Sequence, residues 1–361
     1  MKAVILVGGE ATRLFPLTCN TPKAMVPVLN TPFLEHVIRH LGQHQVKDIT
    51  LAHNHRQQFI KSYFKDGSQF KVRLSYTVEN TPLGTAGAVK NAEKYLDETF
   101  LVLNGDIFTN LNITAMIELH RERKAKATIA LTPVDDPTSY GLVETNAQGR
   151  ITCFREKPRQ SEITTNMINA GTYILEPDIL TYMPPQSNFS FEHDVFPLLL
   201  DRGEPAYAYP STNYWIDIGT PEKYLRLHRD LLSNKSSRYA LPSGSLIGKQ
   251  SRIHPTAQIK GPVVIGSNCT IGESVKLTGP VVIGRDCTIQ SEATIENSVI
   301  WHNVQIGQRA MVKNCILANG CCLNANCIIQ DSTLGDNVTV ATGYKLEPSS
   351  RIWPKTTVEA P

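Results

Sequence analysis

A repeat with a period of six residues occupies the last third of the chain and restricts its fold more than any other feature of the sequence. A branched apolar residue stands at every sixth position from Ile247 to Ile295, nine times in strict register. A smaller side chain follows four positions after each one, from Ser251 to Val299, and glycine directly follows several of the branched residues. The register slips near Trp301 and then resumes. Repetition at one short period is typical of solenoids, in which equivalent turns stack on one another.

The repeat resembles the hexapeptide repeat of left-handed parallel β-helices. One branched and one small side chain per edge would fill a narrow triangular interior, and glycine would form corners where a positive φ is required. Such a helix uses roughly eighteen residues per turn, so residues 241–354 would form about six turns. An exposed end coil of this kind also predicts a homo-oligomer assembled through the β-helix.

The cysteines gather in the repeat, where six of the eight lie between positions 269 and 327. None of them has the Cys-x-x-Cys spacing, which argues against a zinc ribbon or a secreted disulfide scaffold. Cys269 and Cys287 fall on small inward positions three hexapeptides apart. We interpret them as apolar fillers on neighbouring turns, with a disulfide between them as the alternative.

The first 230 or so residues follow a different pattern, in which short β-branched runs alternate with segments of helical period. Strands are expected at residues 3–7, 48–52, 71–78, 100–103 and 128–132, and helices at 33–44, 56–65, 86–96 and 113–124. This alternation predicts an α/β domain with a Rossmann-like, mostly parallel sheet covered on both faces. Ligands of such sheets bind at the carboxyl ends of the strands. A polar stretch at 233–237 separates the two predicted domains, 1–235 and 241–354.

Charge and composition exclude several classes of function. The chain carries 36 basic and 33 acidic side chains, a net charge of +3, which does not suit a nucleic-acid or membrane-surface binder. The hydrophobic content of 41% suits a sizeable core, and no apolar run approaches the roughly 18 residues of a membrane span. Residues 1–9 have one basic residue and lead into a turn, which indicates a buried strand rather than a signal peptide and hence a cytoplasmic location.

The loop after the first predicted strand has the composition of a phosphate-binding loop. Gly8 and Gly9 would let the backbone approach a ligand and present N–H groups to phosphate, while Arg13 and Lys23 add positive charge. The loop is not a Walker A motif, since no Gly-Lys-Ser/Thr follows, and it lacks the GxGxxG dinucleotide fingerprint.

In full, the loop reads Gly8-Gly9-x-Ala11-Thr12-Arg13-Leu14-x-Pro16-Leu17-Thr18 and then Pro22-Lys23-Ala24-Met25, which resembles the signature of the sugar nucleotidyltransferases, or NDP-sugar pyrophosphorylases. Further matching segments are Leu83–Gly87, Asn104-Gly105-Asp106, Tyr140-Gly141, Glu156-Lys157-Pro158, Asn169-Ala170-Gly171 and Trp215–Gly219. The resemblance covers nearly the whole chain and is closest to the mannose-1-phosphate guanylyltransferases, for which Leu-Gly-Thr-Ala-Gly is typical. Most members have glycine at position 11, so the methyl group of Ala11 predicts a negative φ there.

The resemblance implies an enzyme in which a sugar-1-phosphate oxygen attacks the α-phosphorus of a nucleoside triphosphate and pyrophosphate leaves. Such a step needs alignment and charge neutralisation more than covalent help. Arg13 and Lys23 would be the catalytic cations. Asp106 and Asp217 each follow an apolar, strand-like run, and two carboxylates with phosphate oxygens suit Mg²⁺.

The remaining site residues divide into two sets. The nucleotide would be bound by Gly8, Gly9, Glu79, Leu83, Gly84 and Thr85. The sugar phosphate would be bound by Gly141, Glu156, Lys157, Asn169 and Gly171. The segment 191–197 matches the family only loosely and is assigned no role.

Three alternatives to a guanylyltransferase that makes GDP-mannose from GTP and mannose-1-phosphate remain open. Adenylyl, thymidylyl or uridylyl transfer to glucose-1-phosphate is the first, because such base pockets differ by few side chains. A bifunctional enzyme with acyltransferase activity on the β-helix is the second, although only His254 and His302 follow residue 240. A catalytically silent regulatory homologue is the third, but it should lack a phosphate- or metal-binding residue, and here all are present.

Overall fold

The computed structural model describes residues 1–361 apart from residue 10 and residues 55–57, 234–245 and 360–361. The chain forms two compact units, one of residues 1–9 and 34–215 and the other of residues 10–33 and 216–361. Most of the expected linker at 233–237, and the boundary between the predicted domains, lie outside the described residues. Among the described helices, none has the length and apolar character needed to cross a bilayer.

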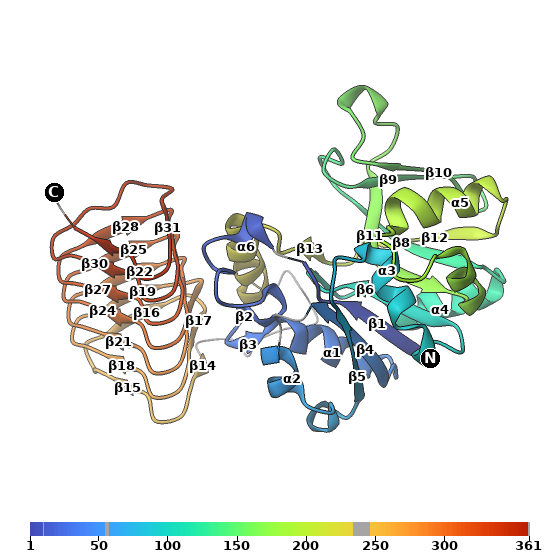
Figure 1. The fold of residues 1–361 in the computed structure, drawn as a ribbon. Helices are drawn as coiled ribbons and strands as arrows, with labels where there is room; N and C mark the ends of the chain where they lie inside the picture. The colour runs from blue at the N-terminus through green and yellow to red at the C-terminus, as the bar shows by residue number, and fades with distance from the viewer. Residues whose placement is uncertain (10, 55–57, 234–245, 360–361) are drawn as a thin grey trace. The chain divides into compact units, whose positions relative to one another are not determined.

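The first unit is built on a sheet with the strand order β10-β9-β11-β6-β1-β4-β5 (Figure 1). Its parallel strands are β1 (Lys2–Leu6), β4 (Asp48–Asn54), β5 (Arg73–Glu79) and β6 (Phe100–Asn104). This part confirms the predicted Rossmann-like arrangement. Beyond β6 the sheet becomes mixed, because β11 pairs antiparallel with its neighbours. The other strands of this unit are β7 (Ile107–Thr109), β8 (Ala127–Pro133), β9 (Gly141–Thr145), β10 (Ile151–Glu156), β11 (Met167–Leu175) and β12 (Ala206–Pro210).

Helices cover this sheet through apolar faces. The helices are α1 (Phe33–Gln43), α2 (Gln58–Phe64), α3 (Gly84–Asn91), α4 (Ile113–Glu122) and α5 (Phe196–Asp201). One core joins α3 and α5 to the strands, since Val89 of α3 and Leu199 of α5 are buried in the same cluster as Val4 and Val102. The loops after β1, β4, β5 and β6 leave the sheet at the carboxyl ends of these parallel strands.

The second unit contains a parallel β-helix, as the hexapeptide repeat predicts (Figure 1). Its first sheet has the strands β14 (Leu246–Ile247), β17 (Val263–Ile265), β20 (Val281–Ile283), β23 (Val299–Ile300), β26 (Ile316–Leu317), β29 (Thr333–Leu334) and β31 (Arg351–Ile352). Its second has β15 (Arg252–Ile253), β18 (Thr270–Ile271), β21 (Thr288–Ile289), β24 (Gln305–Ile306), β27 (Cys322–Leu323), β30 (Thr339–Val340) and β32 (Thr357–Val358). Its third has β16 (Gln258–Lys260), β19 (Lys276–Thr278), β22 (Thr294–Glu296), β25 (Met311–Lys313) and β28 (Ile328–Gln330).

The slip in the repeat near Trp301 is a change in coil length. Val264 lies beside Val282, eighteen residues on, but Val282 lies beside Val299, only seventeen residues on. The prediction that Val299 fills a small inward position is therefore wrong. Ser298 lies beside Val281 in the stack and is fully buried, while Val299 aligns with Val282, the middle residue of β20.

The inward cysteines behave as predicted. Cys269 and Cys287 are buried in the apolar interior, and Cys315, Cys321 and Cys327 join them there. All eight cysteines are free thiols, so the alternative of a disulfide is not realised. Cys287 donates its thiol proton to the Trp301 carbonyl at 3.1 Å, which satisfies a buried polar group on the neighbouring coil.

The second unit also contains the loop of residues 10–33 and helix α6 (Pro221–Leu232), and both pack on the β-helix. This loop carries the short strands β2 (Pro27–Val28) and β3 (Thr31–Pro32), and β13 (Trp215–Asp217) leads from the first unit into the second. Trp301 occupies the corner where earlier coils have glycine, and its indole N–H donates to the Tyr224 hydroxyl of α6 at 3.0 Å. Both side chains are fully buried, and the Tyr224 hydroxyl in turn donates to the Pro27 carbonyl.

Candidate active site

Glycines and a carboxylate meet where β1 and β5 end. Gly8 and Gly9 follow β1 after Val7 and are exposed, and the φ of +101° at Gly9 suits glycine alone. A Cβ on Gly8 would lie 3.6 Å from Glu79 Oε1. The other oxygen, Glu79 Oε2, accepts a hydrogen bond from the Leu83 N–H at 3.3 Å. Its partial burial raises the pKa of Glu79 above the usual value.

The remaining predicted nucleotide residues form the first turn of α3. Gly84 has a φ of +70°, and a Cβ there would come within 2.6 Å of the Phe189 carbonyl oxygen. Thr85 donates its hydroxyl proton to Glu192 Oε2 at 2.8 Å and accepts the Phe191 N–H at 2.9 Å. The structure therefore gathers Gly8, Glu79 and residues 83–85 in one region of the first unit.

Three predicted sugar-phosphate residues come from neighbouring strands β9 and β10. Gly141 pairs with Glu156, and a Cβ on Gly141 would lie 2.9 Å from Glu156 Oε2. The Lys157 N–H donates to the Tyr140 carbonyl at 3.0 Å, which fixes the turn after β10. Burial, and secondly the charge of Glu192, raise the pKa of Glu156.

Asn169 and Gly171 lie on β11, where the strand has an irregular register. Asn169 Oδ1 accepts the Gly171 N–H at 2.9 Å, and its amide Nδ2 donates to the Tyr173 hydroxyl at 2.8 Å. Gly171 has a φ of +65°, and a Cβ there would meet the Ile107 side chain at 2.3 Å. The bulge thus requires glycine at 171 and holds the Asn169 amide in one orientation.

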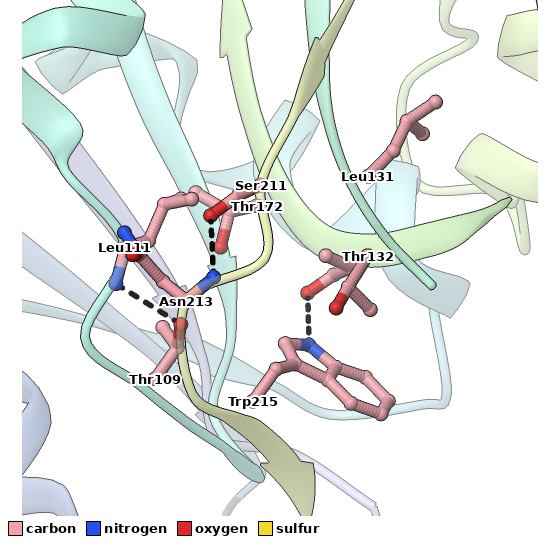
Figure 2. Close-up of a pocket in the computed structure, with 9 residues that line it drawn as sticks. Thr109, Leu111, Leu131, Thr132, Thr172, Ser211, Asn213 and Trp215 are labelled. Carbon is pink, nitrogen blue, oxygen red and sulfur yellow. Dashed lines mark hydrogen bonds between the residues drawn. The ribbon is translucent and has the colours of Figure 1, made fainter. Parts of the chain in front are cut away.

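A small, open recess lies next to this bulge. Figure 2 shows the hydroxyl-bearing side chains Thr109, Thr132, Thr172 and Ser211 around it, together with Trp215. The Trp215 indole N–H donates to the Ala170 carbonyl at 3.0 Å and so braces the segment between Asn169 and Gly171. None of the predicted site residues lines this recess.

Asp106 follows β6 at the same edge of the sheet as Gly8. The Gly105 N–H donates to the Leu6 carbonyl at 2.9 Å, and a Cβ on Gly105 would come within 2.5 Å of that oxygen. The close approach of the two backbones requires glycine and sets Asp106, which is half-buried, beyond the end of β1.

In the second unit, the residues around Arg13 form one turn of 3₁₀-helix, Thr12–Leu14. The prediction of a negative φ at Ala11 is wrong, because its φ is 48° and its ψ is 39°. A left-handed alanine costs roughly 1–2 kcal/mol. Hydrogen bonds offset this cost, since the Ala11 carbonyl accepts from the Leu14 N–H at 3.0 Å and from the Thr18 hydroxyl at 3.0 Å.

Arg13 and Asp217 lie close together around Gly219. A Cβ on Gly219 would be 3.3 Å from Arg13 Nη2 and 2.9 Å from Asp217 Oδ2. Asp217 is almost fully buried, and its Oδ1 accepts a hydrogen bond from Lys223 Nζ at 2.5 Å. Lys23 begins a separate 3₁₀ turn, Lys23–Met25.

The β-helix contacts the loop at Arg13 and at Phe15. Arg351 Nη1 donates to the Arg13 carbonyl at 3.4 Å, and Arg351 also pairs with Glu222 of α6 at 3.1 Å. The Phe15 ring meets the Trp353 ring edge-on with centroids 5.6 Å apart. The loop with the predicted catalytic cation is therefore anchored on the last coils of the β-helix.

The two residues predicted to bind a metal are both aspartates. Asp106 and Asp217 supply carboxylate oxygens, the ligands Mg²⁺ prefers, and substrate phosphates usually complete its octahedron. Among the described residues, no group of three or more His, Cys, Asp or Glu side chains could hold a metal by itself. Each carboxylate taken by itself is thus of a type that holds Mg²⁺ together with a phosphorylated substrate.

Two family models match the chain. The model described as Nucleotidyl transferase matches residues 2–234, and the GMPPB C-terminal domain matches residues 259–361. The chain belongs to the nucleotidyl transferase family. A mannose-1-phosphate guanyltransferase of Aspergillus fumigatus is 37% identical over 353 residues, which are 94% of this chain and 93% of that relative.

Other relatives of this nucleotidyl transferase differ in their named substrates. A UTP–glucose-1-phosphate uridylyltransferase of Synechocystis sp. is 34% identical over 379 residues, which cover 97% of this chain and 98% of the relative. Among solved structures, HddC from Yersinia pseudotuberculosis is 33% identical with a TM-score of 0.55, and the match covers 63% of this chain and 97% of that one. A complex of HddC with GMP-PN matches equally well.

Sequence reasoning missed two polar residues that the structure ties to the predicted site. Lys223 contacts Asp217. In the sequence, Lys223 is distinguished by its position in the first turn of the helix that begins at Thr220-Pro221. Glu192 contacts Thr85 and stands in the segment that was assigned no role. A carboxylate among the apolar residues Phe191, Val195 and Phe196 was a signal in the sequence that could have been used.

Proposed function

We propose that this nucleotidyl transferase makes GDP-mannose and pyrophosphate from GTP and mannose-1-phosphate. The observation that carries the choice of base is the half-buried carboxylate of Glu79 beside Gly8. Guanine alone among the common bases presents two adjacent donors, N1–H and the 2-amino group, that one carboxylate can accept together. The names of the Aspergillus fumigatus relative and of the HddC complex with GMP-PN support the same choice.

In the proposed reaction, an oxygen of mannose-1-phosphate attacks the α-phosphorus of GTP in line. A new P–O bond forms as the bond to the β-phosphate breaks, and pyrophosphate leaves. Arg13 would neutralise the departing pyrophosphate, and Lys23 would stabilise charge on the α-phosphate. Gly8 and Gly9 would offer backbone N–H groups to the triphosphate. Asp106 and Asp217 would hold Mg²⁺, which supplies further charge neutralisation when bound.

The sugar phosphate would bind to the second set of residues. Lys157 would hold its phosphate, and the carboxylate of Glu156 would accept hydrogen bonds from sugar hydroxyls. The Asn169 amide, fixed by Gly171 and Tyr173, would contribute a further polar contact. Gly141 leaves space beside Glu156 that any side chain would fill.

The wider assignments follow from the same proposal. The nucleotidyl-transfer module would be residues 1–235 and the β-helix module residues 241–354. The free thiols agree with a reducing cytoplasm.

A homo-oligomer would form through the end of the β-helix, where Ile247 is 52% exposed on the edge strand β14. Light scattering of Ile247→Lys against the wild type tests this, since an unchanged mass would refute that interface.

One experiment tests the activity and both substrates. Each of five nucleoside triphosphates is combined with mannose- and glucose-1-phosphate, and pyrophosphate release is followed. The highest kcat/KM is expected for GTP with mannose-1-phosphate. The second candidate, UTP with glucose-1-phosphate, is favoured by the Synechocystis relative, which matches along nearly the whole chain. Equal rates with all triphosphates would refute guanylyl transfer.

A further inference from the structure

Glu192 lies between the two sets of residues proposed to bind the substrates. Its Oε2 accepts hydrogen bonds from the Thr85 hydroxyl at 2.8 Å and from the Ser190 hydroxyl at 2.7 Å. Its Oε1 accepts from the Tyr173 hydroxyl at 3.2 Å. Three hydroxyls thus converge on one half-buried carboxylate. Hydrogen bonds to a charged acceptor are stronger than those between neutral groups.

On the nucleotide side, the backbone reinforces the contact with Thr85. The N–H groups of Ala86 and Gly87 both donate to the Phe189 carbonyl, at 2.9 and 3.0 Å. In return, the Phe189 N–H donates to the Leu83 carbonyl at 2.9 Å. The segment before Glu192 is therefore bonded to the first turn of α3, and a shift of Glu192 must move residues 83–85.

On the sugar side, the connection passes through Tyr173. This phenol is fully buried, and burial raises its pKa well above the usual value, so it remains a donor to Glu192 at neutral pH. Its oxygen accepts the Asn169 amide N–H at 2.8 Å, and Asn169 in turn fixes the Gly171 N–H. Four side chains therefore form an unbroken chain of hydrogen bonds from Thr85 to Asn169.

The local backbone is also unusual. Residues Phe191–Val195 form a π-helix, and the Ser190 side chain caps its first N–H groups. Isolated π-helical turns are rare and occur frequently at functional sites. Here the wider turn carries the Glu192 carboxylate between α3 and β11, while Phe191 and Val195 fill the core.

We infer that Glu192 is a positioning residue that couples nucleotide binding to sugar-phosphate binding. Ordering of residues 83–85 around the base would fix Glu192, and through Tyr173 it would fix the Asn169 amide for the sugar. Binding of either substrate would then reduce the entropic cost of binding the other. This inference rests on the proposed function of residues 83–85 and of Asn169.

The test compares Glu192→Gln with a matched control, Glu176→Gln. The control carboxylate also accepts two side-chain hydrogen bonds in the first unit, from Thr99 at 2.8 Å and from His120 at 3.0 Å, but it touches no predicted site residue. We expect Glu192→Gln to raise KM for both substrates by about tenfold, a change of about 1.4 kcal/mol each. The control should leave both KM values within twofold of the wild type.

A binding measurement separates coupling from mere support of the fold. The two halves of GDP-mannose, GMP and mannose-1-phosphate, are used as ligands in calorimetry, with GMP titrated in the absence and presence of saturating mannose-1-phosphate. The wild type should bind GMP more tightly when the sugar phosphate is present, and Glu192→Gln should show no such gain. Tyr173→Phe should remove the gain as well, although it leaves the Thr85 contact intact.

The outcomes distinguish this inference from the proposed function. If the wild type turns over no pair of substrates, the proposed function fails. If the wild type is active and Glu192→Gln keeps both KM values and the gain in GMP affinity, the coupling role of Glu192 is refuted. The same holds if Glu192→Gln lowers only the melting temperature, because a structural role alone would not change the gain in GMP affinity.

Discussion

Replacement of the Glu79 carboxylate by an amide should change the choice of base. In the proposed complex, its two oxygens accept N1–H and the 2-amino group of guanine. In Glu79→Gln one acceptor becomes an NH₂ group that faces a donor, while the remaining oxygen can still accept the Leu83 N–H. A hydrogen bond to a charged group contributes about 1.5–3 kcal/mol. A loss of about 3 kcal/mol corresponds to roughly a hundredfold fall in kcat/KM for GTP.

The assay is pyrophosphate release with GTP and UTP in parallel at saturating sugar phosphate. The ratio of kcat/KM for GTP to that for UTP should fall by the same factor of about a hundred. Glu144→Gln is the control, because Glu144 accepts a hydrogen bond from Thr164 on the exposed surface and no predicted site residue is involved. An unchanged ratio in a folded Glu79→Gln variant would refute this account of base selection.

The raised pKa of Glu79 gives this prediction a pH dependence. Burial is the main cause, so Glu79 takes up a proton at higher pH than an exposed glutamate does. KM for GTP should therefore rise as the pH falls through this raised pKa, and Glu79→Gln should lose that dependence. Because the folded-state pKa is raised, the contribution of Glu79 to stability is full below its unfolded-state pKa and is lost as the pH rises. The amide variant should then be at least as stable as the wild type at neutral pH.

Three further predictions concern the remaining features. Asp106→Asn and Asp217→Ala should each abolish turnover without altering the circular dichroism spectrum, and activity that survives both changes would contradict the carboxylate assignment. Trp301→Ala should lower the melting temperature, because removal of a buried Trp costs about 3–5 kcal/mol, whereas an unchanged melting curve would mean that α6 does not depend on this anchor. Ala11→Gly should stabilise the fold by up to about 1 kcal/mol in urea unfolding, since glycine adopts a left-handed conformation without strain; destabilisation would contradict the φ of 48°.

The sequence predicted those parts of the fold that follow from local pattern. The alternation of strands and helices led to the parallel strands around β1, and the period of six led to the β-helix. The antiparallel strands β9 to β11 were not predicted, because no α-helix separates them and the alternation of strands with helices therefore does not include them. The sign of φ at Ala11 was predicted wrongly. The residue type alone does not show that two hydrogen bonds to the Ala11 carbonyl offset an unfavourable φ.

The candidate site, like the fold, was predicted only where a local sequence pattern indicates it. Residues in family-like motifs were nominated directly, and the structure groups several of them, such as Gly8 with Glu79. Glu192 and Lys223 were missed because their importance lies in partners that the sequence does not place nearby. A carboxylate is recognisable as part of a network only when Thr85 and Tyr173 are seen on either side of it.

The change in coil length shows where this β-helix can accommodate insertions and deletions. The eighteen-residue coils before the slip have Gly-Pro at the corner that precedes the first sheet, at 261–262 and 279–280, whereas the seventeen-residue coils have Asn297, Asn314 or Asp331 followed by a small residue. Asn297 donates to Asn314 Oδ1 at 2.5 Å, and Asn314 donates to Asp331 Oδ1 at 2.8 Å, so the shortened corners bond to one another.

In an ordinary sheet, a one-residue deletion turns every later side chain to the wrong face. Here each coil is aligned only with its neighbours, so one corner absorbs the missing residue and the next strands return to register. Single-residue insertions and deletions should therefore accumulate at these corners during evolution. Strand positions that face the interior should tolerate substitution more readily than any change in length.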